Sequence, residues 1–133
     1  MAVHVTDTHP LWWYANGRHA KLSIRALRLF EAADHERGLV HVPAIVLWEM
    51  SLLLKLGRIR LQQPFGHWMD GLLSQRGFDL VPLDPQVISV AMGLGFTEDP
   101  FDAAIVATAL TRGLPLITRD REITRSKVVE IAW

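Results

Sequence analysis

The stretch TEDPFDAAIVATALTRG, residues 97–113, contains the clearest single signal for the fold. Asp99 followed by Pro100 is a strong helix start, because the aspartate accepts hydrogen bonds from the first turn and proline fits its first position. Gly113 is a typical helix end, and the apolar residues in between predict a helix that packs against a core. One acid is enough to cap this helix, so Asp102 in the same turn suggests a second role.

Strand-like and helix-like segments alternate on either side of this helix. Strands are expected over the short apolar or β-branched residues 3–6, 39–42, 78–81, 114–118 and 128–131. Helices are expected over residues 23–33, 43–57, 64–75, 84–93 and 99–113. This alternation predicts an α/β fold with three layers, α/β/α, around a mostly parallel central sheet. Ligands bind outside the carboxyl ends of the strands in such sheets, so a site is expected at that edge.

The composition is that of one domain spanning residues 1–133. Half of the residues are apolar, and fourteen basic residues balance fourteen acidic ones, so no strong overall charge attracts a polyanion. The absence of cysteine excludes disulfides, thiolate nucleophiles and cysteine-ligated zinc, and it fits a reducing compartment. No apolar run approaches the roughly 18 residues that span a bilayer, and the N-terminus lacks the apolar region of a signal peptide. The sequence therefore predicts a soluble, cytoplasmic domain with no membrane contact.

Four separate segments bring carboxylates to the expected edge. Asp7 follows the first strand, Asp102 opens the helix before the fourth strand, Asp120 follows that strand, and Glu49 lies within a strongly apolar helix. Asp7, Asp99 and Asp120 also suit helix or turn caps, and Asp102 suits the helix dipole. Glu49 has no such simple role, because a charge among apolar neighbours needs solvent, a partner or a metal.

Several carboxylates at one edge favour a divalent cation. Two carboxylates about 5 Å apart repel each other by roughly 3 kcal/mol at an effective dielectric constant of about 20. Oxygen ligands from aspartate and glutamate suit Mg²⁺ or Mn²⁺, and such a site favours phosphoryl chemistry. The six histidines show no zinc-binding spacing, and the chain has no P-loop, GxGxxG or GxSxG motif.

With these residues in view, the chain resembles the PIN domain family, specifically the VapC-type toxins of toxin–antitoxin pairs. Four blocks carry the resemblance in the family's order and spacing: VTDTHPLWW, VPAIVLWEMSLLLKLGRI, DPFDAAIVATAL and LPLITRD. The resemblance implies a PIN-like fold in which Asp7, Glu49, Asp102 and Asp120 bind the metal and act in catalysis. The sequence departs from the DPFD subgroup at Ala103, where that subgroup commonly has arginine.

The resemblance also implies further roles and partners. It gives Asp99 a supporting or capping role, and it places the hydroxyls of Thr8 and Thr118 near the metal. The implied activity is that of an endoribonuclease dependent on Mg²⁺ or Mn²⁺, which cuts by water attack and leaves a 5′-phosphate and a 3′-hydroxyl. The implied partners are an RNA substrate, a second copy in a homodimer, and a cognate VapB-like antitoxin that blocks the acidic site.

RNA binding by a neutral chain requires local positive charge. Three groups of basic residues lie near the acids in the sequence: Arg18, Lys21, Arg25 and Arg28 after Asp7; Lys55, Arg58 and Arg60 after Glu49; and Arg119, Arg121, Arg125 and Lys127 around Asp120. The first and last groups are candidates to flank the acidic edge. A solvated surface with scattered charge explains any one of them equally well. Trp12, Trp13 and Tyr14 can stack on bases, but core or dimer-interface packing is favoured for them. Packing is favoured more strongly still for Trp48 and Trp68.

The alternatives to the nuclease are a catalytically idle binding module and another acidic α/β phosphoryl-transfer protein, such as a phosphatase or a receiver domain. A catalytically idle PIN-like module that binds RNA or protein would lack one of the acids, and none is missing. A haloacid-dehalogenase-like phosphatase needs a DxD motif after the first strand, where this chain has Asp7, Thr8 and His9. A receiver domain needs an early acidic pair and a late lysine partner, which are also absent.

Overall fold

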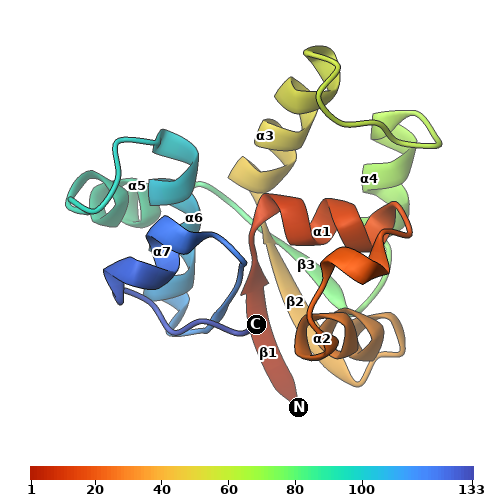
Figure 1. Cartoon of the computed structure of the whole chain (residues 1–133), viewed down its shortest axis with the longest axis horizontal. Coiled ribbons are helices and arrows are strands. Elements are labelled where there is room, and N and C mark those ends of the chain that lie inside the picture. Colours follow the sequence, from red (N-terminus) through yellow and green to blue (C-terminus); the bar gives the residue numbers. More distant parts are fainter.

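The computed structural model describes residues 1–133 and shows an α/β fold built on one four-stranded sheet (Figure 1). The strands are β1 (Ala2–Thr6), β2 (Gly38–Pro43), β3 (Phe78–Val81) and β4 (Leu116–Ile117). Their order in the sheet is β3-β2-β1-β4, and all neighbouring strands are parallel. The predicted fold class is therefore confirmed, and all four strands present their carboxyl ends to the same edge.

Helices cover both faces of the sheet. They are α1 (Thr8–Ala15), α2 (Ile24–Asp34), α3 (Ala44–Lys55), α4 (Phe65–Leu73), α5 (Pro85–Met92), α6 (Pro100–Arg112) and α7 (Arg121–Ser126), with a short 3-10 helix η1 (His19–Lys21). In Figure 1, α1, α2 and α4 lie on one side of the sheet and α5, α6 and α7 on the other. No helix in the chain is long and apolar enough to cross a membrane.

The helix ends follow the capping residues that the sequence contains. Asp99 accepts hydrogen bonds from the backbone N–H groups at the start of α6, and Gly113 ends that helix with a left-handed φ of 64°. Ser23 accepts from the N–H of Ala26 and starts α2 in the same way. These boundaries match the predicted ones within one or two residues.

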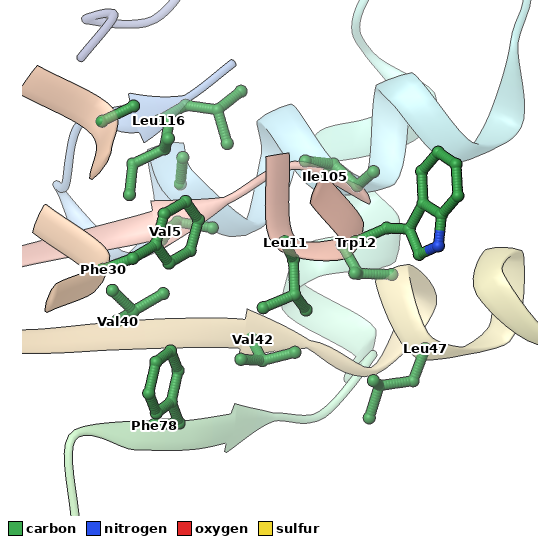
Figure 2. Packing of buried hydrophobic residues seen from close by; sticks show 14 of the residues in the cluster. Val5, Leu11, Trp12, Phe30, Val40, Val42, Leu47, Phe78, Ile105 and Leu116 are labelled. Carbon is green, nitrogen blue, oxygen red and sulfur yellow. The ribbon is translucent and has the colours of Figure 1, made fainter. Parts of the chain in front are cut away.

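The core lies between the sheet and the helices of both layers. Val5 and Val40 from the central strands are buried together with Leu11 of α1, Phe30 of α2 and Ile105 of α6 (Figure 2). Burial of apolar side chains on both faces fixes the sheet between the helices. The carboxyl edge of the sheet is held in place by this core.

The prediction of a fifth strand over residues 128–131 is wrong. Ile131 forms only an isolated bridge with Leu116, and helix α7, which ends at Ser126, leaves only a short segment before it. Lys127 ends that helix with a φ of 56°, so the chain returns to the sheet for one pair of backbone hydrogen bonds. The helix itself follows from Asp120, which caps it.

Core or dimer-interface packing was predicted for two tryptophans; core packing is confirmed for one, whereas the other lies outside the core and keeps only the dimer-interface prediction. Trp68 on α4 is 7% exposed and belongs to the core. Trp48 on α3 is 58% exposed, because that helix buries a different face through Val46, Leu47 and Met50. A helix that is apolar on most of its surface does not reveal from its sequence which face it buries.

Candidate active site

Asp7 lies at the centre of the carboxyl edge of the sheet. It follows β1 directly, and its backbone N–H donates to the carbonyl oxygen of Ile117 in the neighbouring strand. Its Oδ1 accepts a hydrogen bond of 2.7 Å from the N–H of Thr8 and so caps α1. The side chain is only 8% exposed, so both its position and its orientation are fixed.

The Thr118 hydroxyl connects the first acid to the fourth. Its Oγ1 donates to Oδ2 of Asp7 at 2.6 Å and accepts from the N–H of Asp120 at 3.0 Å. The Asp120 carboxylate in turn accepts from the N–H of Ile123 and caps α7. Both the capping and the edge position expected for Asp120 are therefore present.

Glu49 lies on the partly buried side of α3 that faces α1. The Thr8 hydroxyl donates to its Oε1 at 2.5 Å. Val46, one turn earlier and next to Glu49 on the helix surface, is buried, so Glu49 lies at the margin of the buried face of α3. The simpler possibility, a glutamate that merely reaches solvent, does not describe this placement.

The two aspartates at the start of α6 have different roles. Asp99 accepts hydrogen bonds from the N–H groups of Phe101 and Asp102, at 2.8 and 3.1 Å, and acts as the cap. The Asp102 carboxylate receives no hydrogen bond from the chain. It is partly buried and is free to bind something that the chain does not supply.

The acids lie close enough together to affect one another's protonation. Burial, followed by the nearby charges of Asp99, Asp7, Asp120 and Glu49, raises the pKa of Asp102 to about 7. Burial also raises the pKa of Asp7, although the hydrogen bonds from Thr118 and Thr8 oppose that rise. Burial also raises the pKa of Glu49. The hydrogen bond from Thr8 opposes that rise, and the negative charge of Asp7 adds to it. The four predicted site residues therefore share one electrostatic environment.

This donor set fits a hard divalent cation. It consists of carboxylate oxygens, which are the ligands of Mg²⁺ and Mn²⁺, and Asp102 carries charge that no donor in the chain offsets. No three Asp, Glu or His side chains already lie close enough together to hold an ion. Two hollows open beside the acids, one of about 200 Å³ at Asp7 and Asp120 and one of about 520 Å³ at Asp99 and Asp102.

The structure adds His9 to the site, which the sequence did not place there, and brings in Trp13 and Arg119, which were expected only as candidate RNA contacts. His9, Trp13 and Arg119 line the hollow beside Asp7 and Asp120. The available signals were the position of His9 two residues after Asp7 and that of Arg119 directly before Asp120. The hydrogen bonds of Thr8 and Thr118 give specific contacts to residues that the sequence only placed nearby.

Comparison with known proteins agrees with this architecture. The profile of the PIN domain family matches residues 5–128. Ribonuclease VapC22 of Mycobacterium tuberculosis is 31% identical over 125 residues, covering 92% of this chain and 91% of that protein. The chain therefore belongs to the PIN domain family. Within that family, its similarity to Ribonuclease VapC22 places it in the VapC group.

Solved structures share the fold at lower sequence identity. VapBC2 from Rickettsia felis bound to promoter DNA has a TM-score of 0.67 at 15% identity, with 98% of each chain covered. DNA-bound VapBC from Salmonella typhimurium has a TM-score of 0.67 at 18% identity, covering 98% of this chain and 97% of that one. A toxin–antitoxin complex from Klebsiella pneumoniae has a TM-score of 0.56 at 19% identity, covering 88% and 86%.

Proposed function

We propose that the chain is a divalent-metal-dependent endoribonuclease and the toxin of a toxin–antitoxin pair, acting in the cytoplasm through one domain over residues 1–133. The observation that carries the proposal is that four carboxylates from four separate segments lie at one edge of the sheet, near enough for the charges of the other three to raise the pKa of Asp102. The 31% identity to Ribonuclease VapC22 over 92% of the chain supports the same reaction class.

Asp7, Glu49, Asp102 and Asp120 would hold Mg²⁺ or Mn²⁺. When bound, such a cation lowers the pKa of a water molecule and offsets negative charge on phosphate oxygens. Thr118 and the N–H of Thr8 orient the two oxygens of Asp7, and the Thr8 hydroxyl orients Glu49. Each oxygen of Asp7 keeps a lone pair, because a carboxylate accepts about four hydrogen bonds or ligands and only two are used.

The reaction is hydrolysis of an RNA phosphodiester. The oxygen of a water molecule bonds to phosphorus, the bond from phosphorus to the 3′ oxygen breaks, and a proton passes to that oxygen. The products are a 5′-phosphate and a 3′-hydroxyl. Asp102 is the acid of the site with no intramolecular donor, so its charge is the most available to the reacting groups.

The proposed partners are a VapB-like antitoxin and a second copy of the chain. Solved structures with the same fold include complexes named as toxin–antitoxin or VapBC assemblies, which supports the antitoxin. Exposed apolar side chains, including Leu56 and Met92, are consistent with surfaces that other chains cover.

Cleavage of a mixed pool of structured RNAs tests the activity. The purified chain is incubated with Mg²⁺, with Mn²⁺ or with EDTA, beside Asp102→Ala and the control Asp70→Ala, which changes an exposed acid on α4. We expect metal-dependent cutting by the parent and the control, and its loss in Asp102→Ala. Equal cutting by Asp102→Ala, or no cutting by the folded, partner-free parent with any metal, would count against the nuclease.

A further inference from the structure

Aromatic and basic side chains gather on one side of the acidic edge. The rings of Trp13 and Trp133 lie edge to face, with 6.4 Å between their centroids. The guanidinium of Arg119 lies 5.5 Å from the centre of the Trp13 ring, and the ammonium of Lys21 lies 5.9 Å from it. These residues, together with Arg125 beside Trp133, are called the aromatic–basic flank below.

The flank begins at the site itself. The hollow of about 200 Å³ that contains Asp7 and Asp120 is also lined by Trp13 and Arg119. Arg119 lines a second hollow as well, of about 400 Å³, which is completed by residues of α7 and the C-terminal segment. Its charged lining consists of three arginines and no acid: Arg119, Arg121 and Arg125. A continuous surface therefore leads from the carboxylates to a cationic hollow.

A third hollow beside the site has the reverse charge. The hollow of about 520 Å³ at the start of α6 is lined by Glu98, Asp99, Asp102 and Glu122, with no basic residue. Because the chain is neutral overall, this separation of charge is local. A polyanion is repelled from the acidic hollow and attracted to the arginines, so a path from the site over the aromatic–basic flank is favoured.

We propose that the flank binds single-stranded RNA: a base next to the cut phosphodiester stacks on Trp13 or Trp133, and arginines of the flank hold its phosphates. The inference deepens the proposed nuclease function and rests on it for the position of the cut. Unpaired bases are required because only an unstacked base offers its face to an aromatic side chain.

Of the three tryptophans near the site, two are available for this role. Trp12 is buried, and its Nε1 donates to the carbonyl oxygen of Arg60 at 3.0 Å, so it serves the core. Trp13 and Trp133 are only partly buried. Arg119 and Lys21 are exposed, so they can leave the Trp13 ring for a phosphate when a base replaces them. A base stacked on the ring is held more tightly than an exposed cation, so the exchange is favourable.

Binding is measured apart from cleavage, in the Asp102→Asn background with Mg²⁺. A fluorescein-labelled, unstructured oligoribonucleotide is titrated with the chain, and anisotropy gives its Kd at several salt concentrations. Further substitutions in that background are Trp13→Ala, Trp133→Ala and Arg125→Ala, with Trp48→Ala and Arg37→Ala as exposed aromatic and basic controls. Both rings pack against the core, so Trp13→Ala and Trp133→Ala serve as two separate tests, each checked for folding.

We expect Trp13→Ala and Trp133→Ala to weaken binding about 5- to 100-fold, which is the range for loss of one base–aromatic stack. Arg125→Ala should lower the slope of log K against log salt by about 0.7, the value for one phosphate contact on a single strand. In the cleaving parent, Trp133→Ala should raise KM more than it lowers kcat.

Equal weakening by Trp48→Ala, or unchanged RNA affinity in both flank tryptophan variants, would overturn the inference. The second result would fit a flank that serves a protein partner instead. These outcomes are separate from the cleavage test. If the chain cuts no RNA but the flank substitutions weaken RNA binding, the nuclease proposal fails and the binding surface stands. If the chain cuts RNA and the flank substitutions change neither binding nor cutting, the binding surface fails and the nuclease proposal stands.

Discussion

The Thr118 hydroxyl donates a hydrogen bond of 2.6 Å to Oδ2 of Asp7, across a separation of 111 residues in the sequence. The Oγ1 of Thr118 also accepts a hydrogen bond from the N–H of Asp120, so this one side chain fixes two of the proposed metal ligands. This contact exists because β4 lies beside β1 in the sheet. The arrangement of the site therefore depends on a threonine that carries no charge.

Thr118→Val is expected to loosen the site and destabilise the chain. Loss of the hydroxyl leaves the buried Asp7 carboxylate short of a donor, at a cost of about 1–3 kcal/mol in the free energy of unfolding. It also raises the pKa of Asp7 further, because the hydrogen bond from Thr118 opposes that rise. Urea unfolding measures the first effect, and Mn²⁺ titration should show weaker binding. Thr111→Val, at a partly buried hydroxyl near the end of α6, should cost under about 0.5 kcal/mol.

Asp102→Asn is expected to stabilise the chain at pH 8 in EDTA. The pKa of Asp102 is about 7 in the folded chain against 3.8 as the reference value, so the folded state holds the proton more tightly. The stability that this group contributes is complete below pH 3.8 and is lost as the pH rises through about 7. Allowing for partial exposure, the gain at pH 8 is about 1–2 kcal/mol. Unfolding at pH 8 and at pH 3.5 should show that the gain disappears in acid; a variant less stable at pH 8 would contradict this.

The pH dependence on the acid side is expected to involve His4. Burial, followed by the charge of Arg25, lowers the pKa of this histidine on β1 below 6.5. The folded chain therefore binds its proton less well than the unfolded chain. Its contribution to stability is complete above pH 6.5 and is lost as the pH falls towards the lower folded pKa.

A comparison of His4→Gln with the parent at pH 7.5 and pH 5.5 isolates this contribution. The parent should lose more stability than the variant between these two values. His67→Gln, at an exposed position on α4, should follow the parent at both. Parallel losses in the parent and His4→Gln would assign the acid sensitivity to other groups.

Gly77→Ala is expected to be among the most damaging substitutions away from the site. A Cβ at this buried glycine would lie 1.8 Å from the carbonyl oxygen of Ala33, which belongs to the backbone of α2 and cannot turn aside. The required shift of helix against strand should cost at least about 2 kcal/mol. Gly71→Ala inside α4 meets nothing within 4 Å and should be neutral or stabilising by up to about 1 kcal/mol, since alanine favours helix. Thermal unfolding of the two variants should therefore shift in different directions.

Much of the fold was predictable because its helix boundaries depend on residues close to them in the sequence. Asp99 and Gly113 define α6 through capping and a left-handed turn, and no distant residue is needed for either. The acids at strand ends were predictable for a similar reason, since parallel strands end at one edge. The prediction of a fifth strand was wrong because the apolar residues at 128–131 resemble a strand in sequence. In the structure, the chain turns at Lys127 and forms only a single bridge with the sheet.

The finer features of the site depend on contacts that no local pattern encodes. The link from Thr118 to Asp7 requires the order of the strands, and that order is set by packing over the whole sheet. The exposure of Trp48 depends on which face of a nearly all-apolar helix meets α6 and α1. Both follow from the three-dimensional core rather than from spacing along the chain.

The unequal bonding of Asp7 and Asp102 has a consequence for how such a gene would evolve. Asp7 starts a helix and is held by two hydrogen bonds, so its replacement damages folding together with activity. Asp102 has no bond to lose, and its replacement removes repulsion. If the chain harms the cell that makes it, escape mutants at position 102 should persist as abundant, folded protein that still titrates the antitoxin, whereas those at position 7 should be cleared by proteases.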